Sequence, residues 1–196
     1  AEVELLQNRV PKILADSLSP ASCPEQPELE WCPPGHGDLY PALLGSGWLD
    51  RLLEDGVKYA FVSNSDNLGA QLDMNFLRWF AENGAPFVME VTRRTEADRK
   101  GGHLAVRKSD GQLILREVAQ CPDEDIPEFQ NISRHRYFNT NTLWIRLDAL
   151  KEILDANGGV LPLPMIRNKK TLNPRDPESA PAVSYTHLRA HETLAN

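Results

Sequence analysis

The chain has 196 residues, 41% of them hydrophobic and 25% charged, a composition typical of a globular protein that can bury one sizeable core. Its 28 Asp and Glu outnumber its 21 Lys and Arg, giving a net charge of -7 without a basic run, which argues against nucleic acid or an anionic membrane as a partner. Three cysteines without a C-x-x-C motif, and the lack of a signal peptide or membrane-length apolar run, lead us to expect a cytoplasmic protein.

The first half of the chain alternates predicted helices and buried strands. Five prolines between Pro20 and Pro34 fix φ angles and remove backbone donors, so this stretch is expected to be an extended loop. Apolar spacing then predicts a helix over 39–54 bent near its glycines, a strand over 59–62, a helix over 72–83 and a strand over 87–91. Such alternation implies crossover connections and an α/β fold with a mixed, mostly parallel sheet.

The second half begins with a predicted antiparallel hairpin insert. Ser109-Asp110-Gly111 lies between the apolar stretches 103–107 and 113–117, and an Asp-Gly pair tolerates the positive φ of a tight turn. A further strand is predicted over 138–147. It is followed by a helix that Asp148 is expected to cap and that ends near Gly158.

The last residues, 183–196, share no pattern with what precedes them and resemble a translated sequencing-adapter read. We expect them to be a non-native tail, and residues 1–182 to be the domain proper. His187 and His191 have the spacing of a helical metal pair, but in such a tail they are assigned no role.

The most informative motif is the hexapeptide Pro33-Pro34-Gly35-His36-Gly37-Asp38. Its prolines stiffen the approach, its glycines let backbone amides come close to a ligand, and His36 offers phosphate a donor. The predicted helix after Asp38 would point its amide-rich end back at the loop, which suits a planar base or an anion. The alternative is an ordinary Pro-Gly turn whose His36 meets only water.

A second polar motif, Ser63-Asn64-Ser65-Asp66-Asn67, directly follows the predicted strand 59–62. Ligands bind open α/β sheets at this end of the strands, where a carboxylate such as Asp66 can hold Mg²⁺ against phosphates. Asn64 could donate to a sugar or a phosphate. The alternative is that Asp66 only caps the next helix or makes an Asx-turn.

Three weaker signals follow in the hairpin region and the strand after it. Lys100-Gly101-Gly102 offers close approach beside a cation, and Glu117 ends a hairpin strand. Asn139 and Asn141 are two residues apart, which places them on one face of a regular strand. Amides and carboxylates of this kind can bind the hydroxyls of a hexose. Taken singly, each signal is weak: a Gly-Gly pair is usually a turn, a strand Asn is usually solvated, and a residue such as Glu117 is more often exposed than a ligand.

Together and in this order, these motifs resemble the UTP-glucose-1-phosphate uridylyltransferase family. The resemblance covers nearly all of residues 3–175 and rests on the stretches 6–13, 31–40, 61–70, 87–92, 100–104, 117–122, 138–145 and 168–172. It implies a partial glycosyltransferase-A-like, Rossmann-like nucleotidyltransferase domain. The implied reaction converts UTP and glucose 1-phosphate to UDP-glucose and pyrophosphate with Mg²⁺ as cofactor, by in-line attack on the α-phosphorus.

The resemblance also implies roles for residues of the two polar motifs. Gln7 and Gly35 would contact the uracil, and His36 the sugar phosphate. Asn64 would contact the glucosyl part of UDP-glucose, and Asp66 would hold the Mg²⁺. His36 and Asp66 are thus the implied catalytic residues.

The sugar pocket implied by the resemblance draws on the weaker signals. Asn139 and Asn141 would bind the glucose hydroxyls, with Gly102 and Glu117 beside them. Lys170 lies in a family-like segment, but no role carries over to it.

Two family features are missing from the sequence. The glycine-rich triphosphate loop with its lysine would lie upstream of Gln7, and a left-handed β-helix domain would lie downstream. We therefore expect an internal fragment that does not turn over by itself. Two other functions stay open: a UDP-N-acetylhexosamine pyrophosphorylase, whose family resembles P-G-N-G-G where this chain has P-P-G-H-G-D, and a non-catalytic fragment that binds sugar nucleotides.

Overall fold

The computed structural model describes residues 4–163 and 165–187, and these fall into two compact units. The first unit comprises the chain up to Trp48 and the residues after Gly158, and the second runs from Leu49 to Gly158. No helix in the described ranges is both long and apolar enough to cross a membrane.

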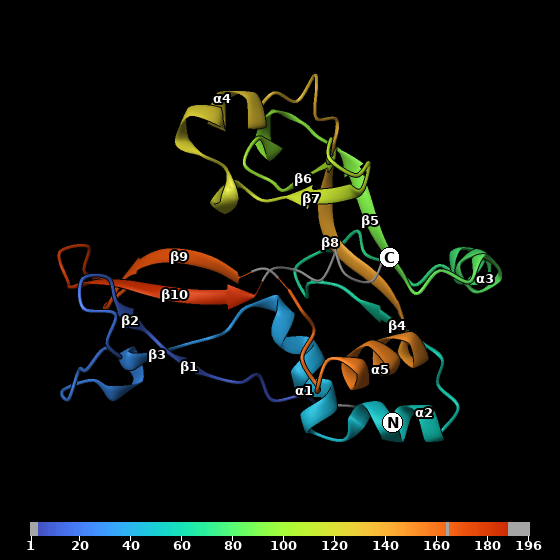
Figure 1. Cartoon of the computed structure of the whole chain (residues 1–196), viewed down its shortest axis with the longest axis horizontal. Coiled ribbons are helices and arrows are strands. Elements are labelled where there is room, and N and C mark those ends of the chain that lie inside the picture. The colour runs from blue at the N-terminus through green and yellow to red at the C-terminus, as the bar shows by residue number, and fades with distance from the viewer. Residues whose placement is uncertain (1–3, 164, 188–196) are drawn as a thin grey trace. The chain divides into compact units, whose positions relative to one another are not determined.

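The first unit is built from short strands and one helix. Strand β1 (Val10–Pro11) pairs antiparallel with β3 (Trp31–Cys32). A three-stranded sheet has the order β2 (Ile13–Leu14), β10 (Pro181–His187), β9 (Met165–Thr171), and Figure 1 shows β9 and β10 side by side. The 3-10 helices η1 (Pro27–Glu30) and η2 (His36–Asp38) lead into α1 (Leu39–Gly45).

Two sequence expectations fall in this unit. The stretch from Pro20 to Pro34 is not wholly an extended loop, because it contains η1 and β3; Pro27 opens η1, where a missing amide donor costs little. The proposed tail begins inside β10, where Val183 is buried and pairs with Ile13. That residues 183–196 are non-native stays a prediction, and His191 lies outside the described residues.

The second unit holds a five-stranded sheet together with helices. Its strands are β4 (Tyr59–Val62), β5 (Phe87–Arg93), β6 (His103–Val106), β7 (Leu113–Arg116) and β8 (Tyr137–Arg146). Its helices are α2 (Trp48–Glu54), α3 (Met74–Asn83), η3 (Glu96–Asp98), η4 (Val118–Gln120), η5 (Asp123–Asp125), α4 (Ile126–Phe129) and α5 (Leu147–Ala156). The expected α/β class is confirmed, and β6 and β7 form the expected antiparallel hairpin.

The expectation of a mostly parallel sheet is wrong for the strand pairs of the described chain, all of which are antiparallel. Leu143 of β8 pairs with Val62 on one side and with Met89 on the other, so β8 lies between β4 and β5 and runs opposite to both (Figure 1). Strands β4 and β5 do run in the same direction, as a crossover through α3 requires. They are not neighbours, because a strand from later in the chain is inserted between them.

Most of the predicted helix boundaries agree with the structure. The predicted bend separates α1 from α2 at Gly47, whose φ is +75°, and α3 ends at Gly84, whose φ is +72°. One cap prediction is wrong. Arg146 is the N-cap of α5, while the carboxylate of Asp148, already inside the helix, accepts bonds from the amide of Ala149 and the Nε of Arg146, both at 2.8 Å.

The core of the second unit gathers around β8 and α5. Trp144, Ile145, Leu150 and Leu154 are almost fully buried, and the Trp144 ring packs against Phe61 and Phe76 at centroid distances of 4.7 and 5.0 Å. Successive residues of β8 from Asn141 to Ile145 are buried, so both faces of the strand are covered there. This agrees with an interior position in the sheet.

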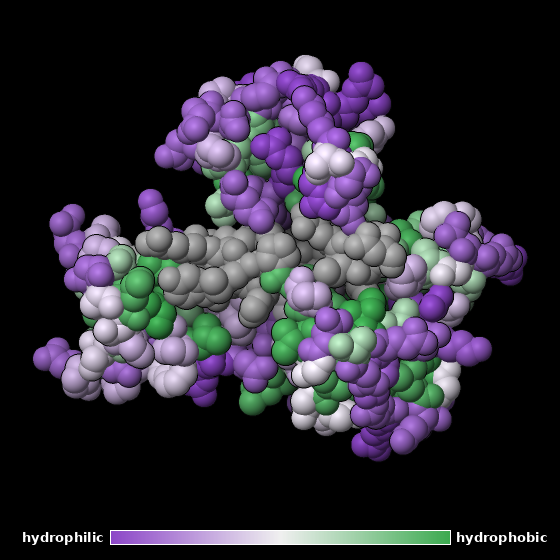
Figure 2. All heavy atoms as spheres, viewed as in Figure 1, coloured by the Kyte–Doolittle hydropathy of each residue, from purple (hydrophilic) through white to green (hydrophobic). Residues whose placement is uncertain are grey.

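Figure 2 shows a mostly hydrophilic surface at its top, where Figure 1 has β6, β7 and α4. A separate polar cluster is built around His103 of β6. His103 is fully buried. Its ring stacks on that of His135 with a centroid distance of 3.8 Å and packs against the Phe129 ring with a centroid distance of 4.5 Å. The pKa of His103 is lowered to about 4, mainly by burial. The nearby His135, Arg116 and Arg94 also lower this pKa, while a hydrogen bond to the backbone of Leu104 raises it. His103 is therefore neutral at physiological pH.

This neutral histidine predicts a pH-dependent stability. The folded pKa of His103, about 4, lies below the unfolded value of 6.5, so the unfolded chain binds the proton first. The contribution of neutral His103 to the free energy of unfolding is therefore complete above pH 6.5 and is lost as the pH falls toward 4. Urea unfolding midpoints should show wild type losing stability over this window relative to His103→Gln. Parallel pH profiles for the two proteins would contradict the prediction.

Candidate functional site

The P-P-G-H-G-D motif forms a tight loop in the first unit. Gly35 has a φ of +94°, a conformation that side chains rarely adopt, so a glycine is needed here. His36 follows on the exposed side of η2, and α1 begins directly after Asp38, as expected from the sequence. The loop thus presents a histidine at a fixed, glycine-dependent turn.

The carboxylate of Asp38 ties this loop to the segment that carries Gln7. Its two oxygens accept hydrogen bonds from the backbone amide and the Nδ2 of Asn8, both at 2.8 Å. Asp38 itself is only 6% exposed. No local pattern predicts this pair of hydrogen bonds, the Asp38 clamp, since its partners are 30 residues apart. The exposed Gln7 therefore lies next to a residue that is fastened to the loop containing Gly35 and His36.

In the second unit, the loop after β4 carries Asn64 and Asp66. The amide of Asn67 donates to the carbonyl of Asn64 at 3.1 Å, and the Nδ2 of Asn67 reaches Thr142 Oγ1 in β8 at 3.2 Å. Asp66 is exposed and is not the cap of α3, because Asp73 fills that position and accepts from the amides of Asn75 and Phe76. The Asp66 carboxylate is thus held at a strand end and faces water.

The two asparagines of β8 adopt an irregular backbone. Asn141 has a φ of +60°, and its amide donates to Asn139 Oδ1 at 2.7 Å. Its Nδ2 donates to Asn64 Oδ1 at 2.5 Å, which joins β8 to the loop after β4. The expectation that both asparagines share a face through regular strand alternation is wrong in its premise, because the left-handed residue interrupts that alternation. Both are nonetheless buried, at 5% and 7% exposure.

Gly102 and Glu117 meet at the edge of the same group. A Cβ on Gly102 would lie 2.6 Å from the carboxyl carbon of Glu117, so only glycine leaves this carboxylate in place. The carbonyl of Gly102 accepts from the amide of Asn139 at 3.0 Å. Contacts therefore run without a break through five of the six residues that the sequence singled out in this unit: Glu117, Gly102, Asn139, Asn141 and Asn64.

The site residues thus fall into one group in each unit. The first group contains Gln7, Gly35 and His36, and the second contains Asp66 with the five residues of the contact chain. The side chain of Lys170 lies outside what the structure describes. Among the described residues, no three His, Cys, Asp or Glu side chains gather as a metal site.

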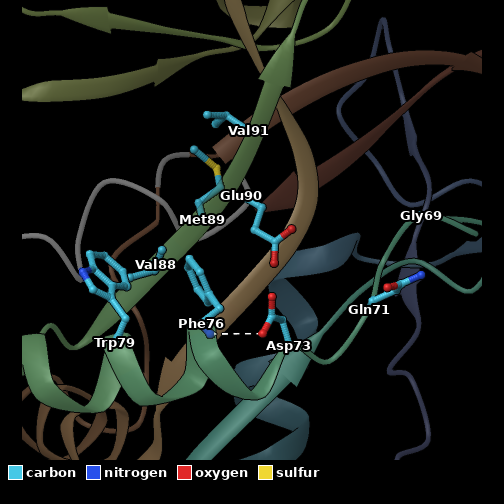
Figure 3. Close-up of a pocket in the computed structure, with 9 residues that line it drawn as sticks. All are labelled: Gly69, Gln71, Asp73, Phe76, Trp79, Val88, Met89, Glu90 and Val91. Atoms are coloured by element: carbon cyan, nitrogen blue, oxygen red, sulfur yellow. Dashed lines mark hydrogen bonds between the residues drawn. The ribbon is translucent and has the colours of Figure 1, made fainter.

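A cavity of about 470 Å³ lies elsewhere in the second unit, between α3 and β5. Phe76, Trp79 and Val88 supply apolar walls, and Figure 3 shows the carboxylates of Asp73 and Glu90 pointing toward one another across it. These carboxylates already have partners, the helix amides and Trp144 Nε1 respectively. None of the predicted site residues lines this cavity.

Comparison with known proteins gives a consistent result. Residues 3–184 match the family model described as UTP-glucose-1-phosphate uridylyltransferase. Enzymes of that name from Saccharomyces cerevisiae and Solanum tuberosum are 46% and 41% identical over 85% of this chain. The chain spans about a third of the length of these relatives, 33% and 34% respectively.

Solved structures agree with the sequence comparison. A crystal structure described as UDP-glucose phosphorylase from Trypanosoma brucei superposes with a TM-score of 0.91 at 50% identity, covering 95% of this chain and 41% of that one. A mutant UDP-glucose pyrophosphorylase from Leishmania major, in complex with UDP-glucose, gives a TM-score of 0.89 at 49% identity, covering 100% of this chain and 43% of that one.

The clamp in the first unit yields a stability prediction. Asp38→Ala leaves two donors of Asn8 without their charged acceptor, and bonds to charged groups contribute about 1.5–3 kcal/mol. Thermal unfolding should show a lowered midpoint, and hydrogen exchange of the Asn8 amide should accelerate. Asp16→Ala is the control, because its carboxylate is exposed and accepts from the adjacent Ser17 amide. Equal exchange at Asn8 in both variants would refute the clamp.

Proposed function

Because the chain belongs to the UTP-glucose-1-phosphate uridylyltransferase family, we propose that it is the sugar-binding portion of a longer enzyme that makes UDP-glucose and pyrophosphate from UTP and glucose 1-phosphate. The observation that carries this proposal is the unbroken contact chain from Glu117 to Asn64. Amides and a carboxylate held this closely together can satisfy adjacent hydroxyls, which a hexose presents in a fixed array.

The proposed sugar pocket uses Asn64, Asn139, Asn141 and Glu117, with Gly102 allowing close approach. Support comes from the burial of Asn139 and Asn141 and from the hydrogen bonds that join both of them to Asn64. These bonds restrict the asparagine side chains before a ligand arrives and so lower the entropy cost of binding. The uracil is assigned to Gln7 and Gly35. This assignment rests on the Asp38 clamp that fastens the Gln7 segment to the Gly35 loop.

The reaction we propose is an in-line attack by the phosphate oxygen of glucose 1-phosphate on the α-phosphorus of UTP, without a covalent enzyme intermediate. Such a reaction asks the protein mainly to position the two phosphates and to neutralise developing charge. His36 donates to the sugar phosphate from the loop it occupies. The departing pyrophosphate takes the electron pair of the broken phosphoanhydride bond.

Asp66 is the residue we assign to the metal. A single exposed carboxylate fits Mg²⁺, which is usually held by one or two protein carboxylates with the rest of its shell from water and substrate phosphates. When bound there, Mg²⁺ would neutralise phosphate charge. The role of Asp66 is to hold that charge at the end of β4, beside Asn64.

Two other functions have less support than this one. The family model names glucose rather than an N-acetylhexosamine, which favours glucose 1-phosphate as the sugar substrate. A binding function without turnover is the second candidate for the chain in isolation, because it spans about a third of its relatives. We place the enzyme in cytoplasmic carbohydrate metabolism, with sugar nucleotides as partners rather than nucleic acid or membranes.

A chimera tests the proposed activity. Residues 3–182 of this chain replace the matching segment of the Saccharomyces cerevisiae relative, and UDP-glucose formation is measured with Mg²⁺. We expect activity from the chimera, none from residues 1–182 alone, and a loss of about 100-fold in kcat/KM for Asp66→Asn. The matched control Asp55→Asn, another exposed acid of the same unit, should behave as the parent. A folded but inactive chimera, or an unaffected Asp66→Asn, would overturn the assignment.

The close approach at Gly102 gives a second test in the same chimera. Gly102→Ala meets the flexible end of the Glu117 side chain, so it should displace the carboxylate rather than unfold the protein. We expect the KM for glucose 1-phosphate to rise about tenfold, with a Tm change below about 4 °C. Gly45→Ala, whose Cβ has no neighbour within 4 Å, should change neither. A tenfold effect from both variants, or from neither, would show that Glu117 is not placed by this contact.

A further inference from the structure

Arg94 is a buried arginine at the end of β5, and backbone carbonyls surround it. It is 5% exposed. Its guanidinium donates to the carbonyl of Asp98 from Nε at 3.4 Å and from Nη2 at 3.2 Å, and to that of Arg99 at 2.5 Å. Nη1 donates to the carbonyls of Phe129 and His135 at 3.1 and 3.4 Å. One side chain therefore satisfies four carbonyl groups.

These four carbonyls belong to two separate segments that both lead into the proposed sugar pocket. Asp98 and Arg99 lie just before Gly102, and the carbonyl of Asp98 also accepts from the amide of Gly101 at 2.9 Å. The other two belong to the segment of α4 and the residues that precede β8, the strand of Asn139. Arg94 thus joins the two chain segments whose ends meet at the Asn139 to Gly102 hydrogen bond.

The chemistry of the guanidinium suits this junction. It carries N–H donors in a planar fork, and no other side chain can reach four carbonyls in this way. Arg94 bonds to the backbone carbonyl of Asp98 and not to its side chain. The carboxylate of Asp98 accepts instead from the amide and the Oγ1 of Thr95, at 2.8 and 2.6 Å. Burial lowers the pKa of Arg94, and Asp98 partly offsets this. Removing the fork would take the Arg94 donors away from the carbonyls of Arg99, Phe129 and His135, which loosens both segments.

We propose that Arg94 is a positioning residue for the sugar pocket, which fixes Gly102 against Asn139 and Glu117 without touching the substrate. The inference rests on the proposed function for its ligand, glucose 1-phosphate. The effect of Arg94 on the hydrogen bond from Asn139 to Gly102 does not depend on that function, because this bond can be followed without any substrate. Loss of Arg94 should therefore weaken sugar binding selectively and leave the central sheet intact.

Three variants in the active chimera separate this role from general stability. Arg94→Met removes all donors, Arg94→Lys keeps the charge and three donors, and Arg99→Ala removes an exposed arginine of the same loop that pairs with Glu96. For Arg94→Met we expect the KM for glucose 1-phosphate to rise at least about tenfold, with the KM for UTP within about twofold. Arg94→Lys should lie in between, and Arg99→Ala should match the parent.

Two further readouts exclude a merely structural effect. Guanidinium at millimolar concentration should lower the raised KM of Arg94→Met by occupying the vacated space, and should not affect Arg99→Ala. Amide hydrogen exchange without ligand should accelerate at Gly101 and Asn139 in Arg94→Met, while the amides of Leu143 and Ile145 stay protected.

The outcomes are distinguishable. Equal rises in both KM values, exchange that accelerates through the whole of β8, or an Arg94→Met protein that behaves as the parent would each overturn the proposal. An inactive parent chimera would refute the proposed function only. In that case the exchange data still decide whether Arg94 fixes Gly102 against Asn139.

Discussion

The structure of the proposed sugar pocket depends on one backbone constraint, the left-handed conformation of Asn141 within the buried strand β8. A non-glycine residue rarely adopts a positive φ, and asparagine is among those that tolerate it best. Here it interrupts the regular alternation of side chains. The Asn141 amide then turns to the side chain of Asn139, and the Asn141 side chain turns to Asn64.

The strand opposite this irregularity adapts to it. The pairing of β5 with β8 shifts register between Met89 and Val91, so Glu90 lies at the irregularity. Its carbonyl accepts from Thr140 Oγ1 at 2.9 Å, and its carboxylate accepts from Trp144 Nε1 at 2.7 Å. Bulges of this kind re-aim side chains next to functional sites. A local departure from strand geometry is therefore stabilised by bonds on both sides of it.

The polar residues of the second unit are held from several directions rather than by one element. Asn67 ties the loop after β4 to Thr142, and Arg94 ties the loop before Gly102 to the segment before β8. Loops fixed in this way can carry binding groups with the precision of a strand, because their carbonyls and amides already have partners. Glu117, which directly follows β7 of the hairpin, lies beside the same glycine.

Local pattern in the sequence determined the α/β class, the positions of β4, β5, β8 and the hairpin, and the C-terminal end of α3 at Asn83 and Gly84. These features follow from apolar spacing and from the φ preferences of glycine, which act within a few residues. The proposed site residues follow from the family resemblance that the order of the motifs carries. Only the tertiary structure decided that β8 enters between β4 and β5, that Asp38 clamps Asn8, and that Arg94 joins two loops. Each of these depends on partners about 30 or more residues apart, and no local preference specifies a partner at that distance.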